Sequence, residues 1–232
     1  MTARRRTAVA LTVVSTIALS PSPFLEFARN YLPPPPARVL DVGCGQGELT
    51  TALAVAGYDL LGIDPLAPLG DLFRRVRLED LQDDEGGFDA VVAVRSLHPI
   101  RDLAHGLDRV AALLRPGAPL VIDEIGWDLM DEPTLDWLYG QRRALAAAGH
   151  GDTPASLDDV RAEWESTHLG VHGFDALRRE LDARFEERAF VWTPFLHRLL
   201  GGVATEVLEQ ALIDAGAIQP LGFRWAGVAR AR

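Results

Sequence analysis

The chain has 232 residues, 48% of them hydrophobic and 24% charged, which suits one soluble α/β domain with an added element. Its 33 acidic and 23 basic residues give a formal charge of -10, which disfavours nucleic acid and anionic lipid as partners, because both are bound largely through Lys and Arg. Cys44 is the only cysteine, so the chain can form neither an internal disulfide nor a cluster of thiolates around zinc, and it fits a reducing compartment.

The N-terminal region has two distinct parts. Residues 4–6 are arginines and residues 7–19 form an apolar run, a layout typical of a secretory signal, although the run is too short to span a bilayer. A short helix is predicted near residues 24–31. Residues 33–36 are four prolines, which cannot continue a helix and predict an extended spacer before the main domain.

Short apolar runs then alternate with amphipathic segments. Helices are predicted over residues 49–56, ending at Gly57, and over residues 103–114, ending at Pro116 and Gly117. Strands are predicted over residues 38–42, 58–63, 74–78 (a weak one), 88–94 and 119–123. This alternation indicates β-α-β units, so the sequence predicts a Rossmann-like α/β fold: a doubly wound, mostly parallel sheet with helices on both faces.

The alternation breaks after residue 124. Residues 129–148 and 157–184 have helical patterns and together are too long for an ordinary crossover, so we expect an inserted helical cap. A strand over residues 187–192, a helix over 203–215 and a strand over 218–229 complete the pattern. The expected organisation is an N-terminal helical segment and spacer (1–36), an α/β core (37–126), a cap insertion (127–185) and a C-terminal completion of the sheet (186–232).

A glycine-rich loop follows the first strand. Gly43, Gly45 and Gly47 allow positive φ and close approach of the backbone to a ligand, and the next helix starts with free amides. A dinucleotide-binding loop needs a third glycine where Glu48 stands, and a P-loop needs a lysine, which is absent here. Asp41 and Glu48 would repel a pyrophosphate but suit a ligand that carries an ammonium and a sulfonium.

Asp64 ends the second strand, about 20 residues past the loop, where an acid can accept both hydroxyls of a ribose. Asp-Pro is also a common turn pair, so Asp64 and Pro65 are compatible with a turn alone. For Asp41, a buried acid that ties down the loop and a ligand contact are compatible interpretations.

Four motifs occur in order across residues 39–124: the glycine loop, Gly-Ile-Asp-Pro at 62–65, Phe-Asp-Ala-Val-Val at 88–92 and Leu-Leu-Arg-Pro-Gly at 113–117. This set resembles class I S-adenosylmethionine (SAM)-dependent methyltransferases. The resemblance implies SAM as the cofactor. It also implies that Gly43, Cys44 and Gly45 lie along the methionine part of the cofactor, that Asp64 holds the ribose and that Pro65 packs on the adenine.

One departure from the family pattern affects the adenine contact. The family often has an Asp-Ala pair after the third strand, where this chain has Arg77 and Leu78, so Glu79 or the Leu78 backbone is the candidate here. Gly47 and Arg95 complete the set of residues that we expect at the cofactor.

Methyl transfer depends mainly on orientation and proximity, and a base is needed only if the acceptor loses a proton. His98 follows the strand over 88–94, at the carboxyl edge where open α/β sheets bind ligands, and is the candidate catalytic residue, as a base or an acceptor-orienting group. A histidine that only packs beside the cofactor fits as well. His168 and His172 are four residues apart but lack further ligands in a recognised pattern, so no metal is expected.

The resulting expectation is a cytoplasmic methyltransferase acting on a small-molecule acceptor, with no nucleic acid or membrane partner. A cofactor enzyme of this kind argues against export, so we expect residues 1–22 to be a packed helix or to follow a start codon upstream of the native one. Two alternatives stay open: a SAM-binding protein without catalysis that serves as a sensor or partner, and a nicotinamide-dependent oxidoreductase, which Glu48 opposes.

Overall fold

The computed structural model describes residues 23–230. The apolar run over residues 7–19, and with it the expectations of a signal or a packed helix, lies outside the described residues. The chain enters the fold through α1 (Pro23–Arg29), and the four prolines then lead into the first strand.

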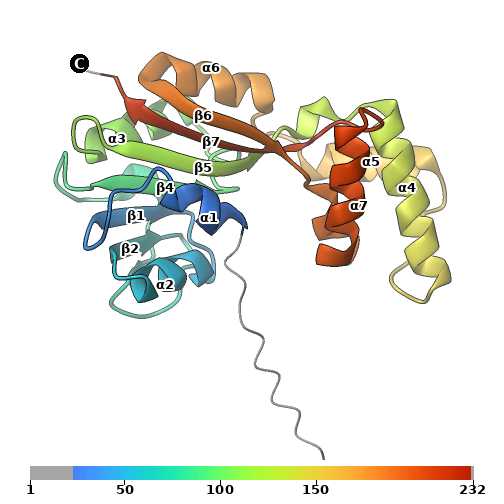
Figure 1. Cartoon of the computed structure of the whole chain (residues 1–232), viewed down its shortest axis with the longest axis horizontal. Coiled ribbons are helices and arrows are strands. Elements are labelled where there is room, and N and C mark those ends of the chain that lie inside the picture. Colours follow the sequence, from blue (N-terminus) through green and yellow to red (C-terminus); the bar gives the residue numbers. More distant parts are fainter. Residues whose placement is uncertain (1–22, 231–232) are drawn as a thin grey trace, which may run out of the picture.

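One seven-stranded sheet forms the centre of the described chain, in the order β3-β2-β1-β4-β5-β7-β6 (Figure 1). Its strands are β1 (Arg38–Val42), β2 (Asp59–Ile63), β3 (Phe73–Arg74), β4 (Ala90–Val94), β5 (Pro119–Ile125), β6 (Phe185–Thr193) and β7 (Gly222–Ala229). The first five pair in parallel, whereas β7 is antiparallel to both β5 and β6. The predicted Rossmann-like, mostly parallel sheet is confirmed.

Helices cover both faces of this sheet. On one face, α1 and α2 (Glu48–Val55) pack on β1, β4 and β5 through a cluster that includes Phe24, Leu53 and Val92. On the other face, α3 (Leu103–Leu113) and α6 (Phe174–Arg184) pack on the sheet, and Leu177 and Leu181 of α6 are fully buried. Side chains alternate between the faces of a strand, so the apolar strand residues supply both cores.

Two further helices form a separate cluster beyond the end of β5. α4 (Glu132–Ala147) and α5 (Leu157–Thr167) pack with Leu196 and Leu200 around Trp164. In Figure 1 this cluster lies together with α7 (Val203–Asp214) to one side of the sheet. The range expected as a cap therefore contains two kinds of helix. α6 packs in the core on one face of the sheet, whereas α4 and α5 pack in the separate cluster beyond β5.

Two sequence predictions differ in detail from the structure. The helix predicted over residues 157–184 is interrupted between α5 and α6, where Gly170 adopts a left-handed φ of 80°. The weak strand predicted over 74–78 overlaps β3 at Arg74 alone, since only Phe73 and Arg74 pair with β2. Within residues 23–230, no helix has the length and apolar character needed to cross a membrane.

We predict that α4 and α5 form a mobile lid over the ligand site, because they lie beyond the carboxyl end of β5 and outside the two cores that flank the sheet. Hydrogen exchange should show slower exchange over residues 131–167 when S-adenosylhomocysteine is added. Peptides from α6 serve as the internal control and should not change, because α6 is anchored in the core. Full protection of residues 131–167 without ligand, unaltered by its addition, would contradict the lid.

Candidate functional site

The three glycines of the loop after β1 all have left-handed φ, at 70° for Gly43, 53° for Gly45 and 82° for Gly47. A Cβ at Gly43 would lie 2.2 Å from the Cβ of Ser96, and one at Gly47 would lie 2.4 Å from the ring of Phe73. A Cβ at Gly45 would have no protein atom within 4 Å. The protein itself therefore requires the first and third glycines, whereas Gly45 faces open space.

Hydrogen bonds fix the position of this loop. The Ser96 hydroxyl donates to the Val42 carbonyl over 2.6 Å, which holds the segment after β4 against the segment after β1. The amides of Gly43 and Cys44 both donate to the Ile63 carbonyl, over 2.8 and 3.0 Å. These two amides are occupied within the protein, so a ligand at the loop would meet the backbone around Gly45 and the start of α2.

Asp41 lies beneath the loop, with 1% of its surface exposed. The Thr50 hydroxyl donates to its carboxyl group over 2.6 Å. Burial raises the pKa of Asp41 to about 6, although the hydrogen bonds from Thr50 act in the opposite direction. Burial, followed by the charges of Asp41 and Asp64, also raises the pKa of the Cys44 thiol to about 12, so Cys44 is an unreactive thiol in the loop wall.

The Asp64 carboxylate joins the loop to the turn after β2. One oxygen accepts from the Leu66 amide over 2.7 Å, and the other faces the Gly45 amide at 3.3 Å. The first contact is the turn contact expected of an Asp-Pro pair. The second places a half-buried carboxylate beside the most open glycine of the loop, so turn formation and ligand binding are compatible at this residue.

The remaining residues expected at the cofactor lie along the same edge. Pro65 is exposed, and Glu79 is half-buried in the short helix η1 (Leu78–Asp80). Arg95 follows β4 and is the only non-glycine residue with positive φ, 51°, in the described part of the chain. A non-glycine residue in this conformation is held there by its surroundings and is often found at functional sites.

A second constellation lies at the carboxyl ends of β4 and β5. Glu124 is fully buried and accepts from the Leu97 amide over 2.7 Å and from the Ile125 amide at 3.3 Å. Its Oε2 is 2.7 Å from Nδ1 of His98. A carboxylate can only accept, so Nδ1 of His98 carries the proton and Nε2 is left as the basic nitrogen of the neutral ring.

The pairing of Glu124 with His98 was not predicted from the sequence. The only signal was a pair of acids, Asp123 and Glu124, near the end of an otherwise apolar strand, a position where burial requires partners. The sequence did not reveal that the partner is His98, 26 residues earlier in the chain.

The segment between α5 and α6 packs against the His98 loop. The His172 amide donates to the His98 carbonyl over 2.9 Å, and the His172 ring approaches the Ile100 carbonyl at 2.9 Å. His168 stacks on Trp127, and burial lowers the pKa of His168, with a smaller contribution from the nearby His98. Within residues 23–230, no group of three or more His, Cys, Asp or Glu residues is placed to hold a metal ion.

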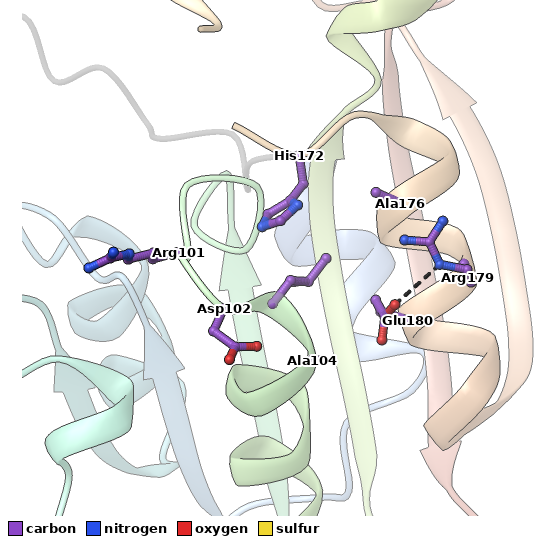
Figure 2. Close-up of a pocket in the computed structure, with 8 residues that line it drawn as sticks. Arg101, Asp102, Ala104, His172, Ala176, Arg179 and Glu180 are labelled. Carbon is purple, nitrogen blue, oxygen red and sulfur yellow. Dashed lines mark hydrogen bonds and ion pairs between the residues drawn. The ribbon is translucent and has the colours of Figure 1, made fainter. Parts of the chain in front are cut away.

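A hollow of about 400 Å³ lies away from the glycine loop, between the start of α3 and α6. In Figure 2, Arg101 and Asp102 lie on one side of it and Arg179 and Glu180 on the other, with His172 at its upper end. Arg179 pairs with Glu180, so charges of both signs line the hollow. None of the residues that line it belongs to the glycine loop or to the turn at Asp64.

The glycine loop has one open position next to a carboxylate. A Cβ would find only open space at Gly45, and the carboxylate of Asp64 lies beside it. This open position next to an acceptor for hydroxyl groups suits a cationic nucleoside.

Comparisons with known proteins agree with this geometry. The chain matches the methyltransferase domain family over residues 17–171. It is 34% identical to an uncharacterized methyltransferase of Mycobacterium tuberculosis strain H37Rv over 116 residues, which are 46% of this chain and 46% of that protein. It is 28% identical to a ubiquinone biosynthesis O-methyltransferase of Azorhizobium caulinodans over 178 residues, 66% of this chain and 68% of the relative.

The fold also matches a solved structure, a putative SAM-dependent methyltransferase from Listeria monocytogenes. The TM-score is 0.55 at 13% identity, covering 90% of this chain and 98% of the other, so this likeness concerns the fold alone. The match to the mycobacterial relatives covers a little under half of their length.

We predict that Gly45→Val abolishes S-adenosylhomocysteine binding, because the side chain would project into the open space beside Asp64. Gly117→Val is the matched control, since Gly117 also has left-handed φ, at 76°, and a Cβ there would likewise have no protein atom within 4 Å, but it lies in the turn before β5. Both changes should cost about 1–2 kcal/mol of stability through backbone strain. Calorimetry should find S-adenosylhomocysteine binding lost in Gly45→Val and retained in Gly117→Val. Normal binding by Gly45→Val would contradict the location of the ligand site at this loop.

Asp64→Ala should weaken S-adenosylhomocysteine binding by about 1–3 kcal/mol, the range for hydrogen bonds to a charged acceptor. Asp59→Ala, at the exposed opposite end of β2, should leave binding unchanged. An Asp64→Ala protein with the wild-type dissociation constant would assign Asp64 to the turn alone.

Proposed function

Because the chain belongs to the methyltransferase domain family, we propose that it transfers the methyl group of SAM to a small-molecule acceptor. The observation that carries the proposal is the loop position at Gly45, which is open on its ligand side and adjacent to the carboxylate of Asp64. The negative charge of the chain, -10, supports a small molecule over nucleic acid.

In this proposal, different residues bind the methionine, ribose and adenine parts of the cofactor. The backbone at Gly43, Cys44 and Gly45 borders the methionine part, Asp64 accepts from the ribose hydroxyls, and Pro65 and Glu79 border the adenine. Asp41 supports the loop from below through Thr50. When bound, SAM supplies an electrophilic methyl carbon on a sulfonium, and the protein contributes orientation and proximity.

We further propose that the acceptor group is a hydroxyl and that His98 takes its proton. Glu124 fixes the ring through Nδ1, which leaves Nε2 as the proton acceptor. The relative from Azorhizobium caulinodans, a ubiquinone biosynthesis O-methyltransferase, supports an oxygen acceptor. Glu124 is thus a positioning residue, and His98 is the catalytic residue in this proposal.

The function is tested by binding and turnover together. Calorimetry should find SAM and S-adenosylhomocysteine bound more tightly than NAD, and incubation of SAM with a panel of phenols should release S-adenosylhomocysteine. Tighter binding of NAD would contradict the cofactor assignment. Tight binding of SAM with no turnover on any hydroxyl, amine or thiol acceptor would favour a sensor or partner without catalysis.

His98→Gln should lower the turnover of a hydroxyl acceptor by about 10²–10⁴-fold, the usual contribution of a general base. Glu124→Gln should have a similar effect, because an amide that donates to Nδ1 would move the ring proton to Nε2. In both variants S-adenosylhomocysteine binding should stay unchanged while turnover falls.

His105→Gln is the matched control, since His105 is exposed on α3. Wild-type turnover in His98→Gln would assign His98 to packing.

A further inference from the structure

Arginine side chains gather around one buried carboxylate at the carboxyl edge of the sheet. The side chain of Asp123, near the end of β5, is 5% exposed. Arg224 faces it across the β5–β7 pair and donates from Nε to Oδ2 over 3.0 Å. Arg198, in the short helix η3 (Leu196–Leu199), approaches Oδ1 of the same carboxylate at 3.9 Å.

Arg95 is the third arginine of this group. Its amide donates to the Asp123 carbonyl over 2.8 Å, which fixes its backbone beside the carboxylate. Burial lowers the pKa of Arg198, and the charges of Arg95 and Arg224 lower it further, so both groups lie near enough to Arg198 to repel its guanidinium. Arg95, Arg198 and Arg224 together form the arginine cluster.

Two of the three guanidinium groups in the arginine cluster lack a hydrogen-bonded protein partner among the described residues. The charges of Asp123 and Glu206 act on Arg198 in the direction opposite to those of Arg95 and Arg224. Glu206 also faces the ring of His197, at 3.9 Å. Across residues 23–230, neither the Arg95 nor the Arg198 guanidinium donates a hydrogen bond to a protein oxygen, although the Arg198 side chain is only 34% exposed.

We propose that the arginine cluster binds a carboxylate or phosphate group of the methyl acceptor. Guanidinium groups bind such anions through pairs of parallel hydrogen bonds, and Arg95 and Arg198 have these donors available. Arg224 remains paired with Asp123, which keeps the third charge in place. The substrate class is therefore an anionic small molecule.

The position of the arginine cluster favours the acceptor over the cofactor. Asp64 and the glycine loop lie at β1 and β2, whereas the three arginines come from the ends of β4 and β7 and from the helix after β6. Arg95 immediately precedes Ser96, the residue that is bonded to the loop after β1. An anion at the cluster thus lies on the far side of β4 from the ribose site and close to the methionine end of the loop. This inference rests on the proposed function, and it proposes the acceptor as the ligand of Arg95, for which the sequence predicted a contact with the cofactor.

The test uses the full chain, with and without S-adenosylhomocysteine, and titrates it with sodium benzoate, phenyl phosphate and the neutral analogue benzamide at fixed ionic strength. We expect at least one of the two anions to bind about tenfold or more tightly than benzamide. Arg198→Gln and Arg95→Gln should each weaken that anion about tenfold, and Arg101→Gln, an exposed arginine of the same loop, should not. If Arg198→Gln fails to fold, the exposed Arg95 provides the variant.

The outcomes separate the anion site from the proposed function. Normal S-adenosylhomocysteine binding with no preference for the anions over benzamide would overturn the anion site alone. Weaker S-adenosylhomocysteine binding in Arg95→Gln and Arg198→Gln would also overturn it, because the anion bound there would be the carboxylate of the cofactor. Failure of the wild type to bind S-adenosylhomocysteine would overturn the proposed function. The anion titrations carried out without S-adenosylhomocysteine would still show whether the arginine cluster binds anions.

Discussion

The contact between Ser96 and the end of β1 is the constraint on which the site depends. The Ser96 hydroxyl bonds to the Val42 carbonyl, and its Cβ occupies the space that any side chain at Gly43 would need. The segment after β4 is thereby fixed against the glycine loop. Arg95 and His98 lie in this segment, so one short polar contact fixes the backbone next to both residues relative to the glycine loop.

Side chains alternate between the two faces of the sheet along a strand, so the two faces differ chemically at this edge. Asp123 and Glu124 are neighbours in β5, so their side chains point to opposite faces of the sheet. On one face, Asp123 forms an ion pair with Arg224, and on the other, Glu124 is hydrogen-bonded to His98. Both acids are buried and both have partners, as the cost of an isolated buried charge requires. The proposed proton acceptor and the proposed anion site therefore lie at one edge of the sheet without His98 facing the arginines directly.

The helices after β5 differ in how firmly they are held, and their patterns alone did not reveal this. The sequence predicted helical character for residues 157–184 as one block, yet α6 buries Leu177 and Leu181 against the sheet. By contrast, α5 packs with α4, with Trp127 after β5 and with the segment after β6. Apolar spacing shows that a helix has a face to bury, but it does not identify the surface that covers it. The prediction that α4 and α5, and not α6, form the lid therefore needed the tertiary contacts.

The sequence by itself determined the order of strands and helices, the glycine loop and the acid after β2, because local periodicity and backbone freedom are encoded within a few residues. It also placed His98 at the carboxyl edge, since topology fixes where parallel strands end. Only the tertiary structure joined Glu124 to His98 and brought Arg198 and Arg224 to Asp123, at separations of 26, 75 and 101 residues. Such pairs depend on the register between strands and on the path of the chain after β6, and no local pattern in the sequence records either.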